Sequence, residues 1–398
     1  VAAGISLSEY YMPGLGGVQR PDMPKHEFNG ANSWVLRAID SVWPDFETAL
    51  TPARLNAAEA RTQAILAASA DLEAHVEGGD LVVRVTNLSG HKLPTGYAEG
   101  RRMWLEVQFE NAGGTVISEL GGYDPLTAVL DTATTKVYEI KHGLDNYMAG
   151  QTGLPAGPSF HFVLNNKILG DNRIPPRGYD STAFATRGAE AIAASYMEQQ
   201  HWDETSFPVP PGATQARVRL LHQTTTKEYI EFLRDENVTN TAGQDAWNLW
   251  DQFGRSAPVE MGLVQVDLAN DPCLEPVEYG LGKLTSLNGY ASLSTLGTPS
   301  VSAGNFQIHV TGGIPGQLMV CFRGPVTLSL PHFGGVLLIL PILRDATLML
   351  DSNGEATFPI AVTPDMVGTT RAYQVMFRDN AASSGIGMTS ALWVKFCD

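Results

Sequence analysis

The stretch that decides the fold runs from Val82 to Val107, VVRVTNLSGHKLPTGYAEGRRMWLEV. At both of its ends, apolar residues alternate with polar ones at the period of a half-buried β-strand. We therefore expect a strand, a polar turn and a second strand. The connection is longer than the roughly two to five residues of a plain hairpin, and it holds His91, Arg101 and Arg102. Such a connection indicates a role beyond chain reversal.

A helix precedes this stretch, and further strands follow it. Thr51 is a good N-cap and Pro52 a good first helical residue, and the Ala-rich run behind them predicts a helix over 51–70. After that helix the pattern changes to short strands separated by turns such as Gly78-Gly79. Residues 120–210 look like long connections rich in Gly and Pro, after which strands and two short helices return.

The composition indicates a globular, lightly charged protein with many turns. The 398 residues are 43% apolar and 17% charged, and they include 40 Gly and 24 Pro. This length supports two or three domains, and frequent turns between short strands favour a mainly β class. We expect two β-sandwich-like domains with an N-terminal helical arm and a few short helices. The predicted units are an arm over 1–50, a first domain over 51–268 and a second domain over 273–398.

Charge and hydropathy argue against two classes of partner. The formal net charge is −16, whereas nucleic acids and anionic membrane surfaces attract basic patches. No apolar run approaches the ~18 residues of a membrane-spanning helix. The opening segment, VAAGISLSEYY, has neither the basic start nor the apolar run of a signal peptide. A mature exported chain or a trimmed fragment would begin in this way.

Several ordered motifs resemble a known family. They are HEFNGAN (26–32), NLSGHKLPTGYAEGRRMWLEV (87–107), KVYEIKHG (136–143), DNRIPPRGY (171–179), QTTTKEYIEFL (223–233) and LWDQFGRSAPVEM (249–261). With them, residues 24–268 resemble the haem-free, β-rich C-terminal module that follows the haem region in some large bacterial multihaem c-type cytochromes. In such proteins a CxxCH-Met-Pro sequence precedes the HxF-Gly segment. The corresponding place here, Leu7 to Pro13, reads LSEYYMP and has lost both cysteines and the histidine. We therefore expect no covalently attached haem.

The C-terminal 120 residues or so carry a looser resemblance. The segments 279–306, DSNGEATFPI and SALWVKF are similar to a small secreted β-sandwich found at the C-termini of exported proteins in environmental bacteria. This resemblance implies a periplasmic or extracellular location.

Two histidines are candidates for haem ligation in trans. A neutral imidazole is a good axial ligand of haem iron, and the family resemblance implies that His26 and His91 could reach the haem of a neighbouring chain. The alternative for each is a turn histidine that bonds a backbone carbonyl and fixes the loop. Both interpretations stay open from the sequence.

Two arginines of the long connection also have two interpretations. Arg101 and Arg102, with Glu99, could hold the turn through planar, bidentate pairing. A ligand that bears a carboxylate is the functional alternative. Downstream, Phe232 is expected to face inward from a helix. Four aromatic residues are expected to fill core between helix and sheet rather than to stack on a ligand: Tyr229, Trp247, Trp250 and Phe253.

Oxygen ligands and cysteines are the remaining candidates. Gly/Pro-rich loops hold four aspartates that are candidate calcium ligands, although no EF-hand spacing is present: Asp124, Asp131, Asp171 and Asp180. The three cysteines allow one disulfide, between Cys273 and Cys397 or between Cys273 and Cys321. Their spacing matches neither a metal site nor a haem-attachment motif.

No catalytic constellation emerges. His201, Asp203, Glu204 and His222 would have to converge with a nucleophile or an open metal position, and their spacing does not indicate this. We predict a non-catalytic exported structural or docking subunit, associated with a multihaem cytochrome or with a self-assembled oligomer. The alternatives are an electron-transfer component and a module that binds carbohydrate or another surface polymer.

Overall fold

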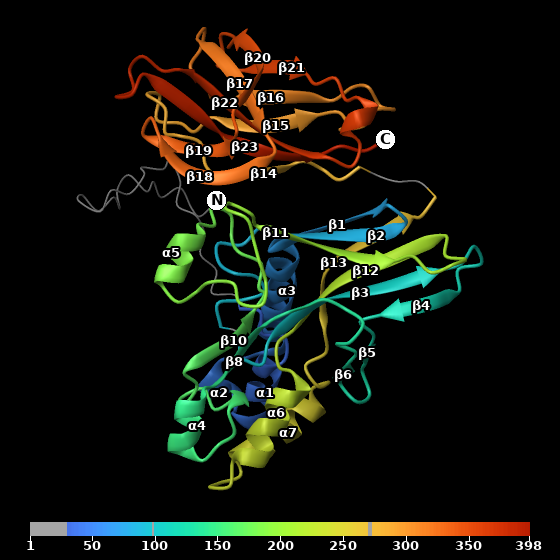
Figure 1. Cartoon of the computed structure of the whole chain (residues 1–398). Coiled ribbons are helices and arrows are strands. Elements are labelled where there is room, and N and C mark those ends of the chain that lie inside the picture. Colours follow the sequence, from blue (N-terminus) through green and yellow to red (C-terminus); the bar gives the residue numbers. More distant parts are fainter. Residues whose placement is uncertain (1–29, 98, 270–272) are drawn as a thin grey trace.

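A computed structural model describes residues 30–97, 99–269 and 273–398. The protein is mainly β, and its strands form two parts that lie one above the other (Figure 1). No helix within these three ranges is long and apolar enough to cross a membrane. The elements of the first part are α1 (Val35–Val42), α2 (Asp45–Thr48), α3 (Pro52–Ala68), β1 (Ala70–Glu77), β2 (Asp80–Asn87), β3 (Arg102–Glu110), β4 (Val116–Leu120), β5 (Tyr123–Asp124), β6 (Val129–Leu130), β7 (Val137–Tyr138), β8 (Ile140–Leu144), α4 (Asn146–Thr152), β9 (Gly157–Pro158), β10 (Lys167–Asp171), α5 (Ser181–Thr186), β11 (Trp202–Pro208), β12 (Gln215–Gln223), α6 (Lys227–Glu236), α7 (Ala242–Gln252) and β13 (Val259–Asp267).

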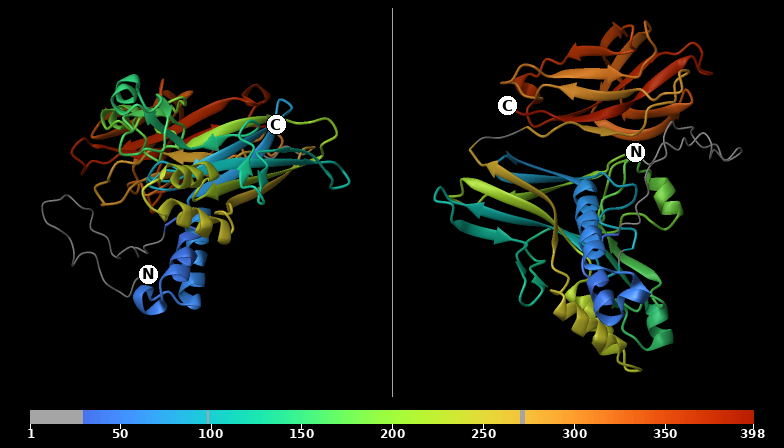
Figure 2. Two further views of the ribbon diagram at one scale, coloured as in Figure 1. Left: turned by 90° about the horizontal axis from the view of Figure 1, so that it is seen from below. Right: turned by 180° about the vertical axis from the view of Figure 1, so that it is seen from behind.

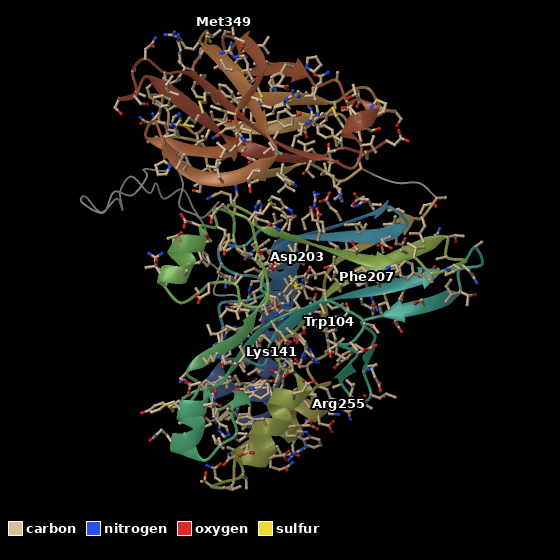
Figure 3. All side chains as sticks on the ribbon, viewed as in Figure 1. Trp104, Lys141, Asp203, Phe207, Arg255 and Met349 are labelled. Carbon is tan, nitrogen blue, oxygen red and sulfur yellow. A yellow bond between two sulfur atoms is a disulfide. The ribbon has the colours of Figure 1, made fainter. Side chains whose placement is uncertain are left out.

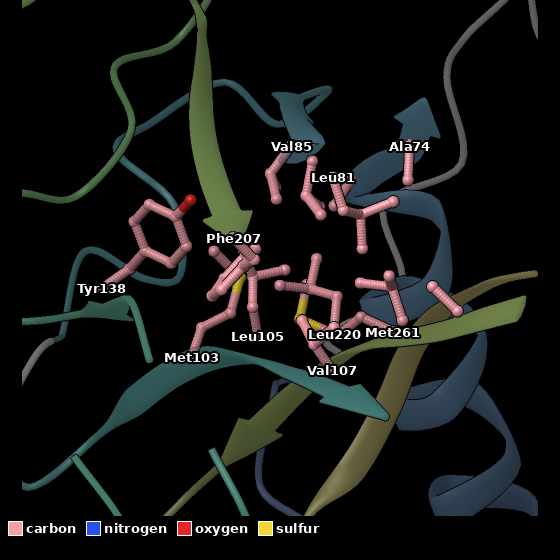
Figure 4. Close-up of a cluster of buried hydrophobic side chains, with 14 of the residues drawn as sticks. Ala74, Leu81, Val85, Met103, Leu105, Val107, Tyr138, Phe207, Leu220 and Met261 are labelled. Atoms are coloured by element: carbon pink, nitrogen blue, oxygen red, sulfur yellow. The ribbon is translucent and has the colours of Figure 1, made fainter. Parts of the chain in front are cut away.

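Two antiparallel sheets of the first part enclose a hydrophobic core. One sheet has the strand order β1-β2-β11, and the other has the order β13-β12-β3-β4. The alternate apolar residues of β2 and β3 point into the space between the sheets, where Leu81, Leu105 and Leu220 are buried (Figure 4). A smaller sheet, β10-β8-β9, and the short hairpin β5-β6 extend from this sandwich.

The two strands expected in the 82–107 stretch are present, but they do not pair with each other. Strand β2 pairs with β1 and β11, whereas β3 pairs with β12, β4 and β7. The connection over 88–101 therefore crosses from one sheet of the sandwich to the other. Facing sheets lie about 10 Å apart, so the crossing needs a longer connection than a hairpin does.

The structure confirms the predicted start of the first long helix and the first hairpin. Helix α3 begins at Pro52, and the Thr51 side chain accepts a hydrogen bond from the Arg54 N–H. Strands β1 and β2 pair around Gly78 and Gly79, whose φ angles are 61° and 93°. Both glycines adopt the left-handed conformation that a tight hairpin turn requires.

Strand β11 and the small sheet were missed, because residues 120–210 were expected to be connections only. Along β11, Phe207 faces the core of the first part, whereas Trp202 packs against the second part. A strand that contributes to two separate cores lacks the simple alternation that marks a half-buried strand.

The second part is a smaller sandwich with its own core. Its main sheet has the strand order β14-β23-β22-β17-β20 and faces the sheet β15-β16-β21. Leu293, Ile308, Val375 and Leu392 are buried between them, and side chains fill the interiors of both parts (Figure 3). Its elements are β14 (Val277–Tyr279), β15 (Ser292–Leu296), β16 (Gln307–Thr311), β17 (Leu318–Gly324), β18 (Val326–His332), β19 (Gly335–Leu340), β20 (Leu343–Met349), β21 (Ala356–Pro359), η2 (Pro364–Met366), β22 (Thr370–Arg378) and β23 (Ile386–Lys395).

The two parts meet across β2 and β11. The Trp202 ring lies 6.0 Å from the ring of Trp393 and 6.5 Å from that of Tyr279. Beside it, the Arg84 guanidinium donates to the backbone carbonyl of Glu275 at 2.9 Å. Apolar packing and a partly buried hydrogen bond therefore join the sandwiches.

The described portion of the N-terminal arm packs on its own chain. Trp34 and Ala38 are buried with Ile230 of α6 and Trp250 of α7. The Trp34 indole N–H donates to the Thr225 hydroxyl at 3.1 Å. Figure 2 shows these helices together at the end of the molecule opposite the second part.

Candidate functional site

The connection over 88–101 is anchored at its start by one buried amide. The Asn87 side-chain NH₂ donates to the backbone carbonyls of His91, Ile174 and Pro175 at 2.8, 2.9 and 3.0 Å. These bonds join two of the motif segments, which are far apart in the sequence. Asn87 is thus a structural clamp, since a buried side-chain amide needs several partners to offset its desolvation.

A buried ion cluster fastens the same two segments. The Lys92 ammonium donates to Asp171 at 2.7 Å, and the Arg173 guanidinium donates to both oxygens of Asp171 at 2.9 and 2.8 Å. Arg173 also donates to the Thr95 carbonyl at 2.8 Å. Burial alone would raise the pKa of Asp171, but the hydrogen bonds and charges of Arg173 and Lys92 outweigh it and hold that pKa below its ordinary value. Burial lowers the pKa of Lys92.

The end of the connection docks on the N-terminus of α6. Thr226 caps this helix, and its N–H donates to the Gly100 carbonyl at 2.8 Å. Gly100 has a φ of 67°, and a Cβ built there would lie 2.3 Å from the Tyr229 ring. Only glycine fits such a close approach in this conformation. The next buried residue, Arg102, donates from Nε to the Gln223 side chain at 3.0 Å.

A cavity of about 560 Å³ opens behind this docking point. The connection between β2 and β3 forms one wall, α6 forms a second, and the segment that contains β8 and β9 forms a third. Its lining combines aromatic and cationic side chains, chiefly Arg101, Arg102, His142, Phe160, Phe162 and Phe232.

Of the two histidines predicted as haem ligands, the structure describes only His91. His26 lies outside the described residues. His91 is exposed, and its Nδ1 lies 3.0 Å from the Lys92 carbonyl oxygen, the distance of a hydrogen bond from an Nδ1–H tautomer. In this structure His91 therefore bonds the backbone of its own turn, and its role toward a partner's haem stays a prediction.

The other two histidines singled out in the sequence are buried in different sheets. His201 directly precedes β11, whereas His222 belongs to β12. Burial, reinforced by the positive charge of Arg177, lowers the pKa of His201 to about 4. Burial, reinforced by Arg101, lowers the pKa of His222 to about 3.

Because the pKa values of both histidines are lowered, we expect the protein to lose stability in mild acid. Below pH 6.5 the unfolded chain takes up protons that the folded chain excludes, so the free energy of unfolding falls as pH decreases. Each histidine contributes about 1.4 kcal/mol per pH unit at full effect. Denaturant titrations between about pH 6.5 and pH 5, above the range of most carboxylates, measure this slope. His222→Leu should reduce the slope near pH 5 by about 1.4 kcal/mol per pH unit, and an unchanged slope would contradict the assignment.

The four candidate calcium ligands lie in three places. Asp171 belongs to the buried ion cluster, and Asp180 caps α5 by accepting from the Ala183 N–H at 2.8 Å. Asp124 and Asp131 lie on the exposed β5-β6 hairpin and line one open depression. Within the part of the chain that the structure describes, no three His, Cys, Asp or Glu side chains are placed to hold a metal ion.

The cysteines form one disulfide. Cys273 is bonded to Cys397, with a Cα–Cα distance of 5.7 Å across 124 positions of sequence. Cys321 is a buried free thiol in β17, and burial raises its pKa.

The comparisons with known proteins identify no family for this chain. No family model matches the chain, and no curated protein matches it. A penta-haem cytochrome c552 from Thermochromatium tepidum is similar in structure, with a TM-score of 0.30 and 16% identity over 52% of this chain and 41% of the cytochrome. Red sea bream transglutaminase gives a TM-score of 0.18 and 10% identity over 84% of this chain and 33% of the enzyme.

A tetra-tandem repeat from the extending region of a large adhesion protein gives a TM-score of 0.20 and 8% identity, over 83% of this chain and 75% of the repeat. TM-scores of this size define no shared fold. The chain also spans less than half of the cytochrome's length.

Proposed function

We propose that this chain is a non-catalytic exported docking subunit that associates with a haem-bearing c-type cytochrome. The observation that carries the proposal is an exposed apolar patch on α1 and α2, formed by Val42, Trp43 and Phe46. These side chains are 50%, 49% and 86% exposed. Single exposed apolar residues are common, but a cluster of large ones indicates an interaction surface.

The position of the patch supports this kind of partner. The same arm buries Trp34 and Ala38 against its own chain, so its outward residues are held in place by a packed inner face. In the sequence, the same arm contains the segment over 7–13, which resembles a haem-attachment motif without its cysteines and histidine. A haem-bearing region of another chain would supply the haem that this segment cannot attach.

The motif residues support a structural rather than a catalytic role. Asn87, Lys92, Asp171 and Arg173 direct their polar atoms toward one another and toward backbone carbonyls. A catalytic group must instead be within hydrogen-bond reach of a reacting atom. The disulfide favours an oxidising compartment, as expected of a periplasmic or extracellular protein.

The arm patch gives a direct test of docking. The double variant Trp43→Ser/Phe46→Ser should lose about 2 kcal/mol of binding free energy, or roughly thirtyfold in affinity, because central aromatic residues dominate interfaces. The tagged chain is incubated with the native periplasmic and extracellular fraction, and the eluate is assayed for haem absorbance and for c-type cytochrome peptides.

Tyr147→Ser is the matched control, since Tyr147 is 69% exposed on α4, away from the patch. Equal recovery of haem protein by the double variant and by the native chain would reject docking through the arm. The binding-module alternative has less support, because the exposed Trp and Tyr side chains within the described ranges lie on four separate segments: Trp43, Tyr97, Tyr147 and Tyr290.

A further inference from the structure

The cavity behind the connection between β2 and β3 has an aromatic wall outside the main cores. The Phe160 ring lies 5.3 Å from that of Tyr229 and 5.6 Å from that of Phe232. Phe162 lies 5.7 Å from Tyr229, and His161 meets the Phe232 ring edge-on at 4.8 Å. Four of these rings, those of Phe160, His161, Phe162 and Phe232, line the cavity and are only half-buried. They present a preformed apolar surface to which a planar molecule can add a further ring.

Two arginines at the same cavity have unused hydrogen-bonding capacity. Arg102 is 3% exposed, and its Nη2 is buried without a hydrogen-bond partner. Arg101 makes no hydrogen bond or ion pair to any described residue, and its guanidinium lies over the Tyr97 ring at 5.2 Å. Buried guanidinium nitrogens are normally satisfied, so Arg102 Nη2 keeps hydrogen-bonding capacity that the ion pair of Nη1 with Glu228 does not use.

Four glutamates line the cavity: Glu99, Glu139, Glu228 and Glu236. Glu139 pairs with Lys141 at 3.0 Å, and Glu236 lies 4.0 Å from the His161 ring nitrogen. Glu228 approaches Arg102 Nη1 at 3.6 Å and is largely exposed, so Nη2 stays unpartnered beside it. Glu99, next to Gly100 on the same connection, also lines the cavity. Its negative charge acts on Arg101 and opposes the binding of an anion there.

We propose that this cavity binds a small aromatic carboxylate. The aromatic wall would hold the ring of the ligand, and Arg101 with Arg102 would hold its carboxylate, because a guanidinium matches a carboxylate in planar geometry. The volume of about 560 Å³ falls within the range of small-molecule sites. The proposal is independent of docking through the arm, since none of the patch residues lines the cavity.

Binding of 1-naphthoate to the full chain tests the proposal, with 1-naphthamide as the neutral analogue of the same shape. Isothermal titration calorimetry at low salt should show saturable binding of the carboxylate, at least tenfold tighter than the amide. Arg101→Gln should weaken the binding of 1-naphthoate at least tenfold. Arg101→Lys should recover part of that loss, because it keeps the charge but not the planar fork. Phe232→Ala should weaken both compounds.

Arg344→Gln is the matched control, since Arg344 is exposed on β20 of the second part, and it should leave binding unchanged. No saturable binding of 1-naphthoate to the native chain would overturn the proposal. Equal affinity for acid and amide would also overturn it, and so would unchanged binding in a folded Arg101→Gln variant. The acid–amide comparison uses the native protein and so does not depend on any variant folding.

Discussion

Replacing Asp171 by asparagine is expected to lower the free energy of unfolding by about 3–5 kcal/mol. The substitution leaves the Lys92 ammonium and the Arg173 guanidinium buried side by side without their shared counter-charge, and removal of one partner of a buried pair carries a cost of this order. Urea denaturation of the first part, followed by tryptophan fluorescence, measures the change.

Asp235→Asn serves as the control, because its partner Arg234 makes an ion pair with it at the surface, where such pairs contribute about 0–1 kcal/mol. The double variant Lys92→Met/Asp171→Leu should be more stable than Asp171→Asn, because it removes most of the buried charge. A loss below about 1 kcal/mol in Asp171→Asn would show that the cluster does not fasten the two motif segments.

Removing the disulfide is expected to destabilise the second part by about 4–5 kcal/mol. The bond between Cys273 and Cys397 closes a loop that spans 124 positions, and the chain-entropy model assigns a loop of this length a value of this order. In the double variant Cys273→Ser/Cys397→Ser, the amides of β22 and β23 should lose roughly a thousandfold of hydrogen-exchange protection. The amides of β3 and β12, which lie in the first part, should keep theirs.

Reduction of the native chain by a phosphine provides the matched comparison. Reduction should cause the same loss of hydrogen-exchange protection in the native protein. It should have no effect on the double variant, because the remaining cysteine, Cys321, is a buried free thiol. An equal loss of protection in both parts would show instead that the two sandwiches unfold as one unit.

The sequence predicted those features that local chemistry specifies. Thr51 and Pro52 placed the start of α3, and Gly78 with Gly79 placed the first hairpin turn, because capping and positive φ are properties of single residues. The mainly β class followed from turn density and alternation. The disulfide partner stayed open in the sequence between Cys321 and Cys397, since connectivity depends on which strands lie side by side.

Features that depend on long-range packing could not be read from the pattern. Strand β11 was missed because Trp202 and Phe207 face different cores. The pattern of the 82–107 stretch predicted its two strands but not that they belong to opposite sheets. The aromatic cavity was also missed. Tyr229 and Phe232 were expected to be inward, but they meet Phe160 from a Gly/Pro-rich segment whose position no local signal fixes.

Haem absorbance of the native assembly, followed by that of the separated chain, tests the central claim most directly. The purified assembly should show a Soret band that remains entirely with the partner when this chain is removed under denaturing conditions, because the segment over 7–13 lacks the cysteines that attach haem. An assembly without a Soret band would contradict association with a haem protein. A band retained covalently by this chain would contradict the claim that it carries no haem of its own.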